Sequence, residues 1–283
     1  MTVADLRGLV ACAGGNDVLY EDAFLPGRPL FLRSACPESY SPKTPLLFVH
    51  HGDLRNGGDF RDFWRPLVDE AQLLVIATEF SATAYPGPAW YNLGNRVDAD
   101  GRENPREEWT YGVPGRIFSA LREQGITARR RYGLFGHSSG GQFVHRLISL
   151  GFRGGVAAAA TANAGTYAMP DLDVAFPYGL GGTGLGETDL RALLAFRLTV
   201  FAGTADIDTA SSHFPNDDAA MRQGPTRFAR AHAYIATARD TAKRREVPCA
   251  WTIVEGADVG HDGEKMSGAA AAVLAAALHA SDS

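Results

Sequence analysis

The chain has 283 residues, of which 45% are hydrophobic and 21% are charged, so it can bury a large core. Its formal net charge of −5 and its pI near 5.9 argue against nucleic acid or an anionic membrane as the main partner, because both favour a concentrated basic surface. No apolar run approaches the roughly 20 residues that a membrane-spanning helix needs, and we expect a soluble protein.

Apolar segments with β-strand character alternate with segments of helical spacing, as expected for a mostly parallel sheet covered by helices on both faces. In chain order we predict a strand at 30–33, a strand at 46–50, a helix at 59–71, a strand at 73–78, a helix at 107–124, a strand at 132–135, a helix at 142–150, a strand at 155–163, a helix at 188–196, a strand at 198–201, a helix at 225–245, a strand at 250–254 and a helix at 264–280. No linker interrupts this order, which predicts a single domain over residues 1–283.

Three cysteines, Cys12, Cys36 and Cys249, form an odd set without C-x-x-C spacing. This pattern favours free thiols in a reducing compartment and therefore a cytoplasmic protein. Residues 9–12, Leu-Val-Ala-Cys, are similar to the cleavage site of a lipoprotein signal. The acidic Asp5 and the short apolar stretch before that site argue against a signal peptide.

Residues 136–140, Gly-His-Ser-Ser-Gly, lie between a predicted strand and a predicted helix. In this context G-x-S-x-G forms a nucleophile elbow, where a strand reverses into a helix at one strained residue whose hydroxyl projects above the sheet. Gly136 and Gly140 leave room where a Cβ atom would collide with a neighbouring element. The motif predicts an α/β-hydrolase fold, with Ser138 as the nucleophile. The insertions at 85–111 and 163–186 are too short to suggest a large lid domain.

A serine hydroxyl needs a base and an acid, which in this fold follow the nucleophile on loops after the two final strands. Asp206 lies on the loop after the strand at 198–201, and Gly203 leads directly to it; Asp208 stays open as the alternative acid. His261 stands in a glycine-flanked loop before the last helix, where the base is required. His137 flanks the nucleophile and is expected to point into the sheet or a helix.

The oxyanion of the tetrahedral intermediate must be met by two backbone N–H groups. One belongs to the residue after the nucleophile, Ser139. The other should come from the loop after the strand at 46–50, and we assign it to Asp53, with Leu54 as the alternative.

Several motifs together resemble those of a known family: His51-Gly52, residues 92–95, residues 136–146, residues 163–165, residues 203–206 and residues 260–263. In these stretches, and over about residues 20–280, the chain is similar to bacterial α/β-hydrolases related to polyhydroxyalkanoate depolymerases and feruloyl esterase-like enzymes. The resemblance implies a serine esterase that needs no cofactor.

Substrate specificity depends on what overhangs Ser138, and residues 85–111 and 163–186 carry aromatic side chains on long loops. Such side chains can stack on an acyl or aryl group, or they can attach the loop to the body of the protein, and both interpretations stay open. The predicted substrate-binding residues are Trp90, Tyr91, Trp109 and Tyr167.

The predicted activity is hydrolysis of carboxylic esters through a Ser-His-Asp triad and an acyl-enzyme, acting on a small-molecule or oligomeric ester. A serine peptidase, a thioesterase and an acyltransferase use the same machinery and stay open, as does a hydrolase-like protein that only binds. We predict no metal: Asp98 and Asp100 fit the spacing of a calcium loop, but Arg96 occupies its first ligand position and Pro105 intrudes.

Overall fold

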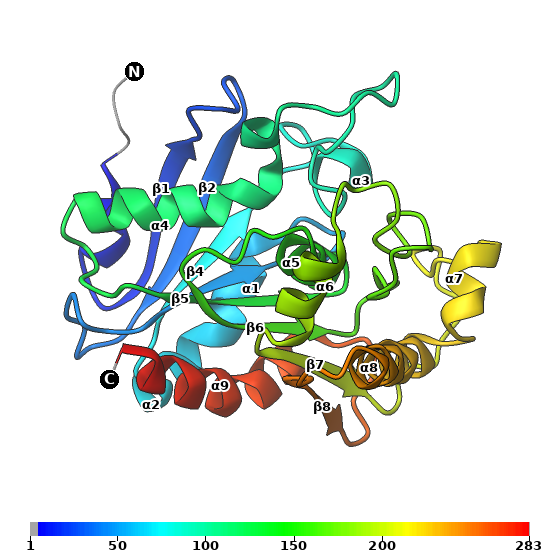
Figure 1. Ribbon diagram of the computed structural model, residues 1–283. Helices are drawn as coiled ribbons and strands as arrows, with labels where there is room; N and C mark the ends of the chain where they lie inside the picture. The colour runs from blue at the N-terminus through cyan, green and yellow to red at the C-terminus, as the bar shows by residue number, and fades with distance from the viewer. Residues whose placement is uncertain (1–4, 283) are drawn as a thin grey trace.

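The computed structural model describes residues 5–282, and this part of the chain is built around an eight-stranded sheet of order β1-β2-β4-β3-β5-β6-β7-β8 (Figure 1). The strands are β1 (Gly14–Glu21), β2 (Pro29–Cys36), β3 (Leu46–His50), β4 (Leu74–Glu79), β5 (Tyr132–His137), β6 (Val156–Ala162), β7 (Leu198–Gly203) and β8 (Trp251–Gly256). The pairs β1·β2 and β2·β4 are antiparallel and all others are parallel, which agrees with the mostly parallel sheet predicted from the sequence.

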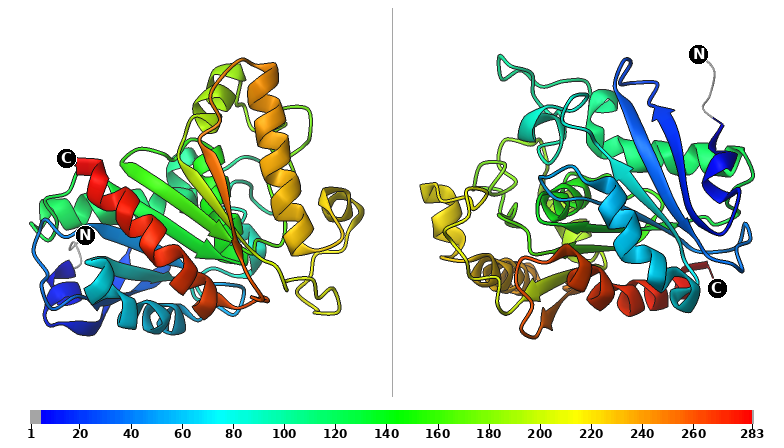
Figure 2. Two further views of the ribbon diagram at one scale, coloured as in Figure 1. Left: turned by 90° about the horizontal axis from the view of Figure 1, so that it is seen from below. Right: turned by 180° about the vertical axis from the view of Figure 1, so that it is seen from behind.

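Helices cover both faces of the sheet, as the two views of Figure 2 show. They are α1 (Gly57–Trp64), α2 (Val68–Ala71), α3 (Gly87–Trp90), α4 (Val113–Glu123), α5 (Ser139–Ser149), α6 (Glu187–Leu194), α7 (Asp218–Gln223), α8 (Arg227–Arg244) and α9 (Gly263–His279). One face carries α1, α2 and α9, and the other carries α4, α5, α6 and α8. Across residues 5–282, none of the helices combines the length and the apolar character needed to span a bilayer.

Two hydrophobic cores lie on the two faces, and β3 shows how the sequence builds them. Its side chains alternate: Phe48 faces the core that includes α4 and α5, whereas Leu47 and Val49 face the core that includes α1 and α9. All five residues of β3 are buried. A strand covered on both faces is mostly apolar, and the run of four apolar residues before His50 is why β3 can be predicted from the sequence.

The predicted strands and helices agree with the structure in order and approximate position, with several differences. The predicted helix at 59–71 is divided into α1 and α2 by a 3₁₀ turn at Arg65–Leu67 that contains Pro66, and the short helix α3 was not predicted. The hairpin partner β1 was not predicted, because it is an edge strand in which only Tyr20 is buried and its composition includes glycine, asparagine and aspartate. The predicted helix at 107–124 begins only at Val113, because two short 3₁₀ turns, Arg106–Glu108 and Thr110–Gly112, precede it, with the buried Trp109 in extended conformation between them. The short helix α7 was also missed.

The segments that follow β4, β6 and β7 gather at one end of the sheet, toward α3 and α7 in Figure 1. Carboxyl ends of parallel strands meet at a common edge, and open α/β sheets bind ligands there. The loops after β3, β5, β7 and β8 carry the predicted site residues to this edge.

Candidate active site

Ser138 stands between the last residue of β5 and the first residue of α5, with φ of 56° and ψ of −119°. Residues other than glycine seldom adopt this backbone conformation, and the close packing around the turn holds Ser138 in it. A Cβ atom on Gly136 would overlap the carbonyl group of Gly140, and one on Gly140 would overlap the carbonyl oxygen of His50. The two glycines are therefore required by contact between backbones, as expected from the motif.

The predicted acid, base and nucleophile lie within hydrogen-bonding distance of one another. His261 Nε2 lies 2.9 Å from Ser138 Oγ, and His261 Nδ1 lies 2.8 Å from Asp206 Oδ2. An ionised carboxylate can only accept, so Nδ1 carries the proton and Nε2 accepts from the serine hydroxyl. Asp206 is 1% exposed, whereas the alternative Asp208 is exposed and its carboxylate accepts from the N–H of Ala210.

Two residues without an assigned role support this arrangement. Asn163, in the left-handed region directly after β6, donates to the carbonyl oxygen of Gly260 at 2.9 Å and accepts from the N–H of Gly203 at 2.9 Å. It thereby joins the acid loop to the histidine loop. Arg227, at the start of α8, places Nη1 3.5 Å from Asp206 Oδ1, the carboxylate oxygen that His261 does not contact. An asparagine directly after a predicted strand is a signal in the sequence for Asn163, because asparagine tolerates the left-handed conformation. No pattern in the sequence indicates Arg227.

His137 is buried, and its ring centroid lies 4.7 Å from that of His261. Burial, together with the nearby His261 and Arg227, holds the pKa of His137 well below its usual value. A neutral ring therefore lies against the catalytic imidazole, and Phe60 lies on the same ring of His137. This placement agrees with the expectation that His137 points inward.

The loop after β3 approaches Ser138 closely: a Cβ atom at Gly52 would lie only 4.0 Å from Ser138 Oγ. His51 fixes the loop, since its Nδ1 donates to the carbonyl oxygen of Gly52 at 2.8 Å and its Nε2 accepts from the N–H of Phe80 at 3.0 Å. Burial lowers the pKa of His51 to about 3, so the ring stays neutral and keeps both bonds. Asp53 comes next, and its carboxylate lies 3.1 Å from His213 Nδ1 at the rim.

Two cavities meet at Ser138. One, of about 390 Å³, is lined by polar side chains that include Asn92, Gln142 and Arg146. The other, of about 250 Å³, is lined by His261 with apolar groups that include Phe60 and Phe63. A scissile bond held at Ser138 can therefore place its two substituents in different surroundings.

The four aromatic residues predicted to bind substrate do not border either cavity, which corrects that expectation. Tyr91, Trp109 and Tyr167 are buried, and Trp90 is half-buried under the guanidinium of Arg28. Tyr91 donates to the carbonyl oxygen of His51 at 2.7 Å, so it attaches its loop to the core beside Ser138. The burial of these aromatic side chains supports the second interpretation given above, in which they attach the long loops to the body of the protein.

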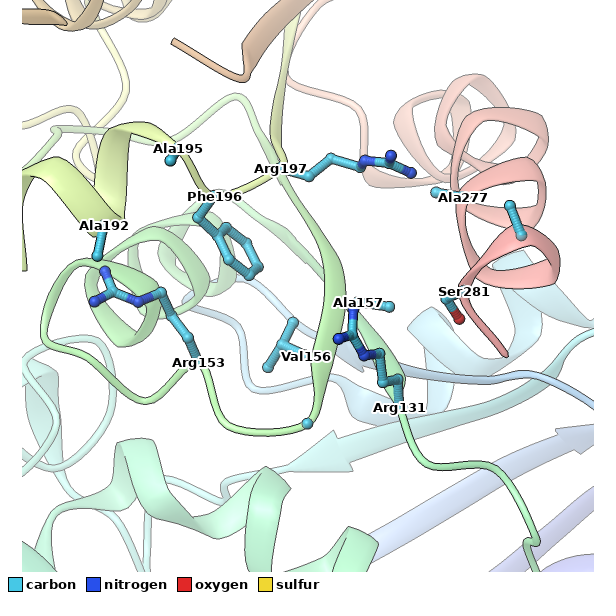
Figure 3. A pocket seen from close by; sticks show the side chains of 12 residues that line it. Arg131, Arg153, Val156, Ala157, Ala192, Ala195, Phe196, Arg197, Ala277 and Ser281 are labelled. Atoms are coloured by element: carbon cyan, nitrogen blue, oxygen red, sulfur yellow. The ribbon is translucent and has the colours of Figure 1, made fainter. Parts of the chain in front are cut away.

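A larger cavity, of about 730 Å³, lies at the opposite end of the sheet, where β5, β6 and β7 begin (Figure 3). Arg131, Arg153 and Arg197 line it, and none of the predicted site residues does. Nowhere in residues 5–282 do three or more His, Cys, Asp or Glu side chains gather as a group able to hold a metal ion.

Comparison with known proteins gives no matching family model and no matching curated protein. Among solved structures, the chain is similar to LpqC, a poly(3-hydroxybutyrate) depolymerase from Bordetella parapertussis, with 40% identity and a TM-score of 0.88 over 94% of this chain and 91% of that one. It is also similar to poly(aspartic acid) hydrolase-1 from Sphingomonas sp. KT-1, with 34% identity and a TM-score of 0.88 over 93% and 98% of the two chains. An S-formylglutathione hydrolase from Agrobacterium tumefaciens is 13% identical with a TM-score of 0.58 over 96% and 97%, a likeness that extends to the fold alone.

Proposed function

Because this chain belongs to the α/β-hydrolase serine esterases related to poly(3-hydroxybutyrate) depolymerases, we propose that Ser138, His261 and Asp206 are its catalytic triad. The protein is a serine hydrolase that cleaves carboxylic esters. The observation that supports the triad is the continuous hydrogen-bonded chain from the hydroxyl through the imidazole to the buried carboxylate.

In the first half of the reaction, His261 Nε2 takes the hydroxyl proton while Ser138 Oγ attacks the ester carbonyl. Asp206 keeps the imidazole in the required tautomer and stabilises the imidazolium that forms. The imidazolium then gives the proton to the departing alkoxide, which leaves as the alcohol. Water repeats the sequence on the acyl-enzyme and releases the acid.

The oxyanion is proposed to be held by the backbone N–H groups of Ser139 and Asp53. Ser139 opens α5, so its N–H has no partner within the helix. Asp53 follows Gly52 on the loop that His51 fixes beside Ser138. Donors fixed in advance need no reorganisation when charge develops, and removing one such donor typically costs about 2.7–4 kcal/mol.

The substrate is proposed to be a small or oligomeric ester that enters the two cavities at Ser138. The similar proteins are described as acting on poly(3-hydroxybutyrate) and on poly(aspartic acid), so an oligomer of short acid units is the closest chemical class. Cavities of about 390 Å³ and 250 Å³ fit one or a few such units on each side of the scissile bond.

Hydrolysis of p-nitrophenyl butyrate, with a thioester and a peptide p-nitroanilide as parallel substrates, tests the proposed chemistry. We expect the ester to have the highest kcat/KM, and Ser138→Ala to lower kcat by about 10⁴-fold or more while the variant stays folded. Preference for the thioester or the anilide would reassign the substrate class, and full activity in Ser138→Ala would reject the triad.

We also propose that the protein works in the cytoplasm. Cys12, Cys36 and Cys249 are all free thiols, and burial raises the pKa of Cys36 to about 11, which keeps it protonated. Cell fractionation tests this location, and recovery of the protein outside the cytoplasmic fraction would contradict it.

A further inference from the structure

Arg146 is a buried cation with no acidic partner among the residues that the structure describes. Its side chain is 2% exposed, and no carboxylate in residues 5–282 lies within ion-pair distance of it. Nη1 donates to the carbonyl oxygen of Asn92 at 3.0 Å and Nη2 to Thr166 Oγ1 at 3.1 Å, while Nε is buried without an acceptor. A guanidinium stays charged at any physiological pH, so this burial is costly unless an anion joins it.

A second buried arginine shows how a structural guanidinium is satisfied in the same protein. Arg230 is 0% exposed, and each of its three nitrogens donates to a backbone carbonyl: Nε to Gly224 at 2.9 Å, Nη1 to Gly165 at 2.7 Å and Nη2 to Pro215 at 2.8 Å. Arg146 lacks this complete set. It also lines the cavity at Ser138, which Arg230 does not.

The helix α5 aims Arg146 at the reacting serine. Gln142 and Arg146 are four residues apart and lie on one face of α5, Ser138 directly precedes the helix, and all three line the 390 Å³ cavity. Eight residues of helix span about 12 Å, and a helical side chain leans toward the N-terminus, which brings the guanidinium nearer to Ser138. An extended acyl chain of a few bonds covers such a span.

The position of His261 decides which part of the substrate meets Arg146. The imidazolium must give its proton to the departing oxygen, so the alcohol part lies on the side of His261. His261 lines the 250 Å³ cavity and does not line the 390 Å³ cavity. The acyl part consequently extends into the cavity that holds Arg146.

We propose that Arg146 binds a carboxylate carried by the acyl part of the substrate, so that the preferred esters are those of dicarboxylic acids or of oligomers with acidic acyl units. This inference rests on the proposed function of Ser138. A guanidinium and a carboxylate match in planar geometry and form paired, charge-assisted hydrogen bonds. Asp53, the only carboxylate among the residues that line this cavity, is at the rim and already lies against His213.

The test compares two esters of equal length that differ only in charge: the mono-p-nitrophenyl ester of adipic acid and the p-nitrophenyl ester of adipic acid monoamide. For the wild type we expect kcat/KM to favour the anionic ester by roughly tenfold to a hundredfold. In Arg146→Gln this ratio should fall toward one. In Arg153→Gln, which removes a guanidinium from the cavity at the opposite end of the sheet, the ratio should stay as in the wild type.

A wild-type ratio of one or less would overturn the inference, as would an unchanged ratio in Arg146→Gln. If that variant does not fold, inhibition of the wild type decides: adipate should compete with the neutral ester, and adipamide should compete at least tenfold more weakly. Equal inhibition would also overturn it. Failure of the proposed function is distinguishable, because the wild type would then hydrolyse neither ester.

Discussion

At the scale of single residues, burial separates groups that the sequence leaves equivalent. Asp206 and Asp208 lie two residues apart on one loop, yet only the first is enclosed, faces His261 and lies near Arg227. An enclosed carboxylate interacts more strongly with an imidazolium than a solvated one does, because water screens the charge less. The exposed Asp208 instead stabilises a local turn, because its carboxylate accepts from the N–H of Ala210.

Asp206→Asn should lower kcat by about 10³- to 10⁴-fold with little change in KM, because the neutral amide no longer selects the catalytic tautomer of His261. Asp208→Asn is the matched control and should retain kcat within a few-fold. Both are measured with p-nitrophenyl butyrate. Equal losses in the two variants, or a greater loss in Asp208→Asn, would contradict the choice of acid.

Much of the site was predictable at this scale, because Ser138, Asp206 and His261 each follow a strand that can be predicted from its apolar residues. The cavity lining was not predictable. Tyr91 and Tyr167 lie on glycine-rich loops and could equally well face solvent, substrate or core, and only the tertiary structure shows them buried. The role inferred for Arg146 depends on its burial without a carboxylate partner in the described part of the chain, and no pattern in one sequence indicates that a cation will lack such a partner.

At the scale of elements, the elbow depends on how closely α5 approaches the strands. The first turn of α5 lies against the end of β3, where Gly140 meets the backbone of His50 and His51. This contact places the N-terminus of α5 beside the loop that carries Asp53. The same elements were predicted from apolar spacing, whereas the late start of α4 was not, since the buried Trp109 and Tyr111 imitate helical periodicity.

Gly140→Ala should destabilise the protein by at least about 1–3 kcal/mol and lower esterase activity, because the new methyl group must displace rigid backbone. Gly268→Ala, in the exposed interior of α9 with nothing within 4 Å of the new Cβ atom, should instead stabilise by about 0.5–1 kcal/mol. Urea unfolding measures both. A stable, active Gly140→Ala variant would show that α5 is not held so closely.

At the scale of the whole molecule, four buried histidines link stability to pH. Burial lowers the pKa of His50 and of His51 to about 3, and it holds the pKa values of His137 and His145 well below the usual range. His145 needs its neutral form to keep both of its hydrogen bonds, because Nδ1 donates to the carbonyl oxygen of Gly141 and Nε2 accepts from the N–H of Ala168. In the unfolded chain each ring titrates near 6.5.

The free energy of unfolding should therefore decrease as the pH falls from about 6.5 toward 3, because the unfolded chain binds protons that the folded chain refuses. In this window each histidine lowers the free energy of unfolding by up to about 1.4 kcal/mol for each pH unit of acidification. Well above pH 6.5 the four histidines no longer make the free energy of unfolding depend on pH. Urea unfolding at pH 7.5 and at pH 5.5 measures the difference. Equal or greater stability at pH 5.5 would contradict the neutral state of these rings.

Covalent labelling with a fluorophosphonate probe tests the central claim most directly, because the reagent reacts with a serine only where a base has activated its hydroxyl. The wild type should take up one label per chain, located at Ser138 by peptide mass mapping, and folded Ser138→Ala should take up none. An unlabelled wild type, or a label that persists in Ser138→Ala, would contradict the proposal that this serine is the nucleophile.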